Sequence, residues 1–180
     1  MEDDFDRRPR ESPDKVWSPN GNRLFLGLDP GVTGAVALVS ADGCLVLVED
    51  LPTTARGSGR VKRECNAAGL AQLLRPYGGD VAHGVVELVA AMPRQGVASM
   101  FSIGHSAGTA TAVLACLGIG FELLPPAKWK RLAELPADKA LVLTAARRLW
   151  PDAPLRHAKD HGRAEALCMA RLAIQRHGRS

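Results

Sequence analysis

The sequence of 180 residues lacks the features that would place it in a membrane or in an oxidising compartment. No apolar run reaches roughly 18 residues without a polar interruption, which excludes a transmembrane helix. The four cysteines are widely spaced and form no C-x-x-C pair, so we expect reduced thiols rather than a zinc site or a disulfide framework. The N-terminus has no apolar signal core, and its acidic residues argue against a transit peptide. We expect a cytoplasmic protein, or one of an organellar stroma or nucleoid, that is not secreted.

Acidic residues are scarce in the middle of this basic chain, whose formal net charge is +4. Between residues 81 and 133 only Glu87 and Glu122 are acidic, so the presence of each of these carboxylates needs a structural or functional explanation. A net positive charge is compatible with an anionic partner. Two basic clusters are candidates for contacts with a phosphate backbone, with solvated loops as the alternative. They are Arg56, Arg60, Lys62 and Arg63 in the glycine-containing loop expected at 53–64, and Lys128, Lys130 and Arg131.

Periodicity predicts one α/β domain at residues 23–178, preceded by a flexible polar tail at residues 1–22. Apolar runs separated by turn residues predict strands near 24–28, 35–39, 44–48, 81–88 and 120–124. Helical spacing predicts helices after Asn66 and at 97–117, 127–131, 137–150 and 162–175. Three hairpin-linked strands followed by strands that alternate with helices predict a mixed five-stranded sheet flanked by helices. The first three strands are expected to be antiparallel.

Two carboxylates stand at the ends of predicted strands. Asp29 follows the first strand in an Asp-Pro-Gly turn, and Glu87 lies at the end of the fourth. An aspartate in such a turn often caps it, and a glutamate at a strand end is often a surface residue. The alternative is that both are metal ligands at one rim of the sheet, which requires further acids at matching places.

Further acids occur at the entrance of the last predicted helix, where Asp160, His161 and Glu165 follow one another closely. His161 and Glu165 are four residues apart and share a helix face. Asp160 and Glu165 are five residues apart, so their side chains can meet only if Asp160 lies at the entrance of the helix rather than within it. Glu165 alternatively pairs with Arg163 or Arg171. If the four acids meet, their repulsion raises carboxyl pKa values in the metal-free state. Oxygen ligands favour Mg²⁺ or Mn²⁺ over zinc, and two such ions promote phosphodiester hydrolysis.

Four motifs occur in a recognisable order between residues 24 and 173. They are GLDPGVTG at 27–34, VE at 86–87 with PRQG at 93–96, PPAKWK at 125–130, and KDHGRAEAL at 159–167. With these motifs the chain resembles the RuvC-type Holliday junction resolvases of the RNase H-like superfamily, and looks closest to their chloroplast and phage-like branch. The resemblance implies an RNase H-like fold and a homodimeric endodeoxyribonuclease that cuts four-way junction DNA by paired nicks.

The resemblance also implies site residues. Asp29, Glu87, Asp160 and Glu165 would be the catalytic acids that bind Mg²⁺, for which Mn²⁺ would substitute, with no nucleotide cofactor. Arg94 and Gln95, in the stretch expected near the junction centre, join the two basic clusters as DNA-binding residues. In the bacterial RuvC pattern the last two acids are usually three residues apart, whereas residue 162 here is glycine. We therefore expect Asp160 to supply the missing function, with His161 as a helper that protonates or positions the leaving group.

Three other functions compete with this interpretation. An actin-like or sugar-kinase-like ATPase has a phosphate loop similar to residues 29–34, but it needs two related domains, and this chain shows no second copy. A ribonuclease H-like enzyme would use the same metal chemistry on RNA–DNA hybrids. A junction-binding protein without activity would not need all four candidate acids.

Overall fold

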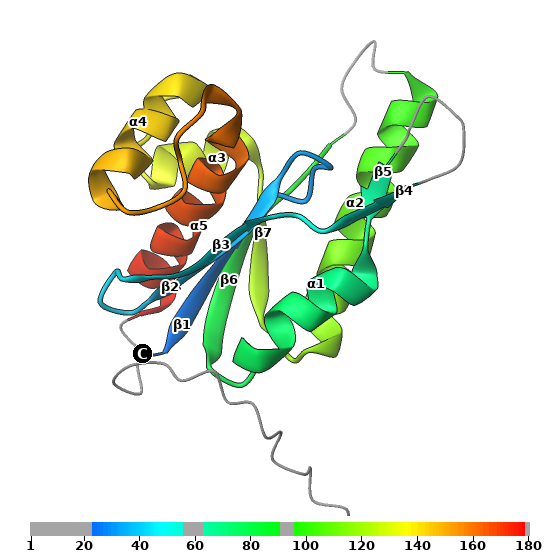
Figure 1. Cartoon of the computed structure of the whole chain (residues 1–180), viewed down its shortest axis with the longest axis horizontal. Coiled ribbons are helices and arrows are strands. Elements are labelled where there is room, and N and C mark those ends of the chain that lie inside the picture. Colours follow the sequence, from blue (N-terminus) through cyan, green and yellow to red (C-terminus); the bar gives the residue numbers. More distant parts are fainter. Residues whose placement is uncertain (1–22, 56–62, 91–95, 179–180) are drawn as a thin grey trace, which may run out of the picture.

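The protein, described here by a computed structural model for residues 23–55, 63–90 and 96–178, places a central β-sheet between two layers of helices (Figure 1). The tail expected at residues 1–22 lies outside the described residues. One face of the sheet carries α1 (Ala67–Leu74) and α2 (Val97–Cys116). The other face carries α3 (Pro126–Leu132), α4 (Lys139–Leu149) and α5 (His161–His177). The described segments also contain two short 3₁₀ helices, η1 (Arg75–Tyr77) and η2 (Ala158–Asp160).

The main sheet has five strands in the order β3-β2-β1-β6-β7. Its members are β1 (Leu24–Leu28), β2 (Ala35–Ser40), β3 (Leu45–Asp50), β6 (Val81–Glu87) and β7 (Phe121–Leu124). The first three strands in the chain, β1, β2 and β3, are joined antiparallel. Strand β6 pairs in parallel with β1, and β7 pairs in parallel with β6. The predicted mixed sheet is confirmed. The parallel strands require crossover connections, which α1 and α2 provide.

The basic segment at 53–64, expected to be a loop, is structured at both ends. There β4 (Thr53–Ala55) pairs antiparallel with β5 (Arg63–Cys65) in a separate two-stranded sheet. The β-branched Thr53 and Thr54 favour the strand, and the side chain of Arg63 bonds across the pair, with its Nε 2.6 Å from Oγ1 of Thr53. The loop prediction was therefore wrong for these residues, while residues 56–62 lie outside the described segments.

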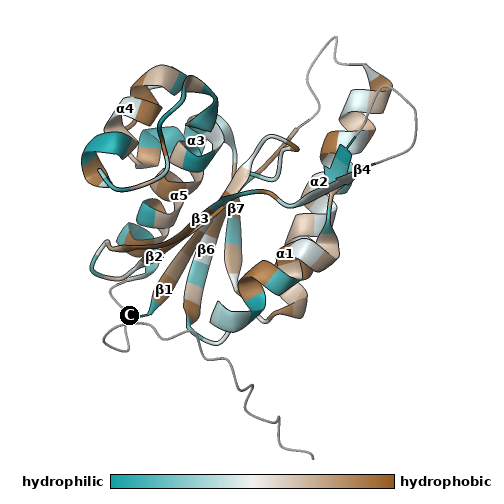
Figure 2. Ribbon diagram, in the orientation of Figure 1, coloured by the Kyte–Doolittle hydropathy of each residue, from teal (hydrophilic) through white to brown (hydrophobic). Residues whose placement is uncertain are grey.

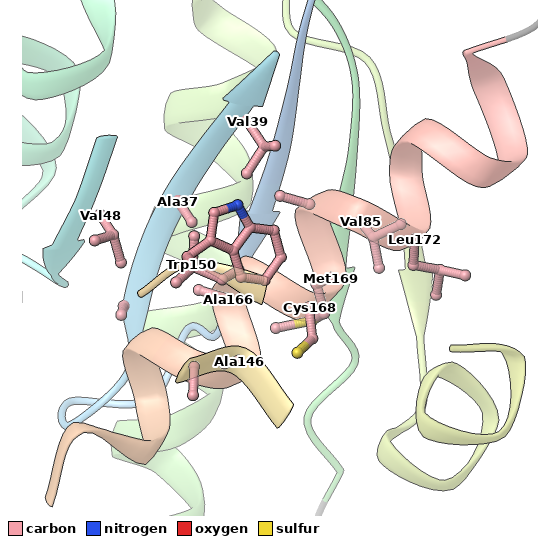
Figure 3. Close-up of a cluster of buried hydrophobic side chains, with 14 of the residues drawn as sticks. Ala37, Val39, Val48, Val85, Ala146, Trp150, Ala166, Cys168, Met169 and Leu172 are labelled. Carbon is pink, nitrogen blue, oxygen red and sulfur yellow. The ribbon is translucent and has the colours of Figure 1, made fainter. Parts of the chain in front are cut away.

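Alternation along β1 distributes its side chains between the two cores. Leu24, Leu26 and Leu28 belong to the cluster under α1 and α2, whereas Phe25 belongs to the cluster under α4 and α5. The central strands are accordingly apolar on both faces (Figure 2). In the second cluster Trp150 is surrounded by strand residues such as Val39 and by α5 (Figure 3). This two-sided burial is typical of a sheet covered by helices on both faces.

Helix α5 lies directly on the sheet because β1 has no side chain at residue 27. A Cβ atom placed on Gly27 would lie 1.9 Å from the carbonyl oxygen of Ala166, so only glycine allows this approach. Nine of the first twelve residues of α5 are buried. The contact positions the beginning of α5 beside the ends of β1 and β6. Within the described segments, no helix combines the length and the apolar character needed to cross a membrane.

Candidate active site

Asp29 and Glu87 lie side by side at the rim of the sheet where β1 and β6 end. The two strands are parallel and pair Leu28 with Val86, so the residues that follow are neighbours. Since successive side chains alternate between faces, Glu87 shares the face of Val85, and Asp29 shares that of Phe25. Both carboxylates therefore belong to the face that α5 covers.

The turn after β1 holds Asp29 in place. Oδ1 of Asp29 accepts a hydrogen bond from the backbone N–H of Gly31 at 3.0 Å, which is the turn-capping role expected of an Asp-Pro-Gly sequence. The hydroxyl of Ser106 in α2, which is fully buried, donates to the carbonyl oxygen of Pro30 at 2.7 Å. The capping role and a place in an acidic site are thus compatible, because the turn cap uses only one carboxylate oxygen.

Glu165 comes to the same rim from the second turn of α5. Its side chain is only 5% exposed, and Oε1 lies 2.7 Å from Nζ of Lys130 in α3. The alternative partner Arg163 is instead bound to Asp50 at 2.6 Å. The sequence indicated nearby arginines of α5 as partners, whereas the structure supplies a lysine from a different helix.

Glu87 has a neutral partner from α3. The indole Nε1 of Trp129 donates a hydrogen bond to Oε2 of Glu87 at 2.8 Å, and Trp129 itself is fully buried. Packing in the core accounts for the burial of Trp129 but not for this bond. The only signal in the sequence was the PPAKWK motif, which contains Trp129 next to Lys130 but does not indicate Glu87 as the acceptor.

The acids influence one another electrostatically. Burial raises the pKa of Asp29, and the negative charge of Glu165 adds to this rise. Burial also raises the pKa of Glu87, again with contributions from the charges of Asp29 and Glu165. The predicted direction of the pKa change is thus found for these two residues, but its main cause is desolvation rather than mutual repulsion.

Asp160 is placed differently from the other three acids. Its Oδ2 accepts a hydrogen bond from the backbone N–H of His157 at 2.7 Å, and this bond holds the pKa of Asp160 below its usual range. The charges acting on it include those of Arg163 and Lys159. Asp160 also lines a groove of about 500 Å³ together with Thr33 and Lys159. The structure thus brings together Asp29, Glu87 and Glu165, while Asp160 closes the turn before α5.

His161 lies close enough to Asp29 that its positive form favours the ionised carboxylate. Among the residues that the structure describes, Nδ1 of His161 is the only buried side-chain nitrogen or oxygen without a hydrogen-bond partner. The next residue has no room for a side chain, because a Cβ atom on Gly162 would lie 2.7 Å from the carbonyl oxygen of Thr33. This close approach leaves no space for an acidic side chain three residues before Glu165 in the observed arrangement of α5 and the β1–β2 turn.

The acids are held by protein groups rather than arranged around a common point. In the described segments, no group of three or more histidine, cysteine, aspartate or glutamate side chains is positioned to hold a metal ion. Asp29, Glu87 and Glu165 each accept a hydrogen bond or pair with a cation from the chain itself. The carboxylate oxygens of Asp29, Glu87 and Glu165 are nevertheless donors of the kind that Mg²⁺ prefers.

The predicted DNA-binding residues are distributed unevenly. Five of them lie outside the described residues: Arg56, Arg60, Lys62, Arg94 and Gln95. Lys128 and Arg131 are exposed on α3, and Arg63 is exposed beside Thr53. Lys130 is only 12% exposed and is paired with Glu165, so it faces the acids rather than the surface.

No family model and no curated protein sequence matches the chain. Its structure does match solved structures. RuvC of Thermus thermophilus in complex with a Holliday junction substrate superposes with a TM-score of 0.64 at 19% identity, over 87% of this chain and 95% of that one. The chain has the RuvC fold. A second structure of Thermus thermophilus RuvC gives a TM-score of 0.52 at 18% identity over the same shares of the chains. The predicted RNase H-like fold class is thereby confirmed.

Proposed function

We propose that this protein is an endodeoxyribonuclease that resolves four-way DNA junctions by paired, Mg²⁺-dependent nicks, with Mn²⁺ as a substitute. The observation that carries the proposal is that Asp29, Glu87 and Glu165 lie at one rim of a RuvC fold, near enough for their charges to act on one another. One structure with this fold contains a Holliday junction substrate, which supports the same substrate class here. Membership of the chloroplast and phage-like branch and the compartment stay predictions from the sequence.

The chemistry of the proposed site follows from its charges. Asp29, Glu87 and Glu165 would hold divalent cations, which activate a water and stabilise the leaving oxygen of a phosphodiester. The burial that raises the pKa of Asp29 and Glu87 also strengthens their attraction for a cation, because ionised carboxylates are poorly solvated there. In the absence of a cation, Lys130 balances the charge of Glu165.

We propose His161, rather than Asp160, for the fourth position. The carboxylate of Asp160 is engaged in the turn at His157, whereas His161 adjoins Asp29 and has a ring nitrogen without a partner. An imidazole at this place is suited to position or protonate the leaving oxygen. This assignment revises the sequence-based preference for Asp160.

Two copies of the chain would place two such sites on the two-fold symmetric junction. The outer face of α2 is the candidate interface. Val97 and Phe101 are 78% and 61% exposed, and a Cβ atom on Gly104 or Gly108 would meet nothing within 4 Å. Ser102, Ser106 and Ala110 of α2 are buried against the rest of the chain, whereas Gly104 and Gly108 are not used for packing within it and leave room for a second helix.

The deciding experiment is incubation of an immobile and a mobile four-way junction with the full-length protein in Mg²⁺. The wild type is expected to nick opposed strands, while Asp29→Asn and Glu165→Gln bind the junction without cutting it. Glu122→Gln is a matched control, since Glu122 pairs with Arg176 away from the site. Tight binding without nicking by the wild type would contradict the proposal, as would preferential cleavage of an RNA–DNA hybrid duplex.

A further inference from the structure

Helix α3 carries two adjacent side chains that contact two different acids of the site. Trp129 donates to Glu87, and Lys130 pairs with Glu165. Only the first of these contacts joins a neutral donor to a carboxylate, and a neutral donor has no charge with which to compete against a metal ion. The Trp129–Glu87 bond can therefore persist when a cation arrives.

We propose that Trp129 is a positioning residue, whose indole N–H holds one oxygen of Glu87 so that the other oxygen is presented to the divalent cation. The inference rests on the proposed function and adds a residue to it. The indole nitrogen is a donor only, so the orientation of the bond is unambiguous. A carboxylate ligand held by such an outer partner loses less rotational freedom on binding metal.

The fold makes the indole a rigid donor. Residue Leu124 at the end of β7 pairs with Glu87, and α3 begins two residues later at Pro126. This short connection returns the chain over the end of β6. Trp129 is then fully buried between the sheet and α5, so its ring has a single position from which the N–H reaches Glu87 at 2.8 Å.

The chain contains a matched control for this bond. Trp150 is also buried and belongs to the same core cluster (Figure 3). It donates its indole N–H at 2.9 Å. Its acceptor, however, is the backbone carbonyl of Gly43, in the turn between β2 and β3. Replacing either tryptophan by phenylalanine removes an indole hydrogen bond and creates a similar core defect. Only Trp129→Phe removes a bond to a carboxylate of the site.

The first test measures Mn²⁺ affinity by calorimetry on the full-length wild type, Trp129→Phe and Trp150→Phe. Loss of the outer partner is expected to weaken Mn²⁺ binding by roughly 10–100-fold in Trp129→Phe. Both variants are expected to lose thermal stability, while Trp150→Phe keeps the wild-type affinity. Equal Mn²⁺ affinity in Trp129→Phe and wild type would overturn the inference, and so would equal weakening in both variants.

A second measurement avoids any variant at Trp129. The chain has three tryptophans, so Trp17→Phe and Trp150→Phe assign the indole N–H resonances by elimination. On titration with Mg²⁺, the Trp129 resonance is expected to shift saturably and the Trp150 resonance to stay in place. If the protein binds Mg²⁺ and cuts junctions while the Trp129 resonance does not move, the inference alone fails. If the wild type neither binds divalent ions nor cuts junctions, the proposed function fails with it.

Discussion

Nζ of Lys130 lies 2.7 Å from Oε1 of Glu165, and the two side chains are only 12% and 5% exposed. The pair joins α3 to α5 beside Asp29 and Glu87. A buried carboxylate without a counter-charge is strongly disfavoured, and two further acids next to it increase that cost. Lys130 is thus the cation that allows the protein to fold with this acidic rim before any metal ion binds.

Removing this cation is expected to destabilise the metal-free protein. Lys130→Met leaves the buried charge of Glu165 unpaired, which costs about 3–5 kcal/mol of the free energy of unfolding. Urea unfolding in the presence of a chelator measures the loss. The double variant Lys130→Met/Glu165→Gln should recover most of it, and Lys128→Met, on the exposed side of the same helix, should lose little. Wild-type stability in Lys130→Met would contradict this account.

The raised pKa of Asp29 makes the stability of the metal-free protein depend on pH. A raised pKa means that the folded state binds the proton more tightly than the unfolded chain, so ionisation of Asp29 at neutral pH opposes folding. Asp29→Asn is therefore expected to have a higher Tm than wild type at pH 7, since asparagine still accepts the bond from Gly31. The difference should shrink as the pH falls through the raised pKa toward the ordinary value near 3.8. A Tm difference that does not change with pH would refute the prediction.

Residue 162 is expected to tolerate no side chain. In Gly162→Ala the new Cβ would lie 2.7 Å from the backbone oxygen of Thr33, which forces α5 or the β1–β2 turn to shift. We expect a loss of about 1–3 kcal/mol in chemical unfolding, as for other overpacked sites. Gly79→Ala, where the Cβ meets nothing within 4 Å, is the control and should change stability by no more than about 0.5 kcal/mol. Gly162→Asp should likewise destabilise, without improving metal affinity.

Single-turnover cleavage of a junction by variants of two adjacent residues distinguishes their roles. His161→Ala is expected to slow cleavage by roughly 10²-fold or more while leaving junction binding intact, as expected when a general acid or positioning group is lost. Asp160→Asn retains an oxygen for the His157 N–H and should cut at a rate near that of wild type. The reverse result would restore the sequence-based assignment to Asp160.

The proposed dimer interface on α2 is tested by adding charge where the monomer has space. Gly108→Glu places a carboxylate on the exposed face of α2 without a clash inside the chain. We expect wild type to elute as a dimer of the 19.1 kDa chain and Gly108→Glu as a folded monomer in light-scattering chromatography. Gly79→Glu, in the turn between η1 and β6 rather than on the exposed face of α2, serves as the control. A dimer that survives Gly108→Glu would move the interface elsewhere.

The turn and strand patterns were sufficient to predict the five-stranded sheet and its antiparallel first half. Period-two alternation and the Asp-Pro-Gly turn are local properties, so they also placed Asp29 and Glu87 at strand ends on one rim. The β4–β5 pair escaped prediction because glycines and arginines dominate its segment. Two threonines beside them form a strand only when a partner strand is present.

What the sequence by itself determined is therefore the order of elements, their faces and three acids on elements that meet. Only the tertiary structure decided which group each acid contacts: Trp129 for Glu87, Lys130 for Glu165 and the backbone N–H of His157 for Asp160. These partners come from packing α3 against α5 and from the close approach of α5 to the sheet. Such contacts depend on the three-dimensional arrangement of distant segments, which no local periodicity specifies.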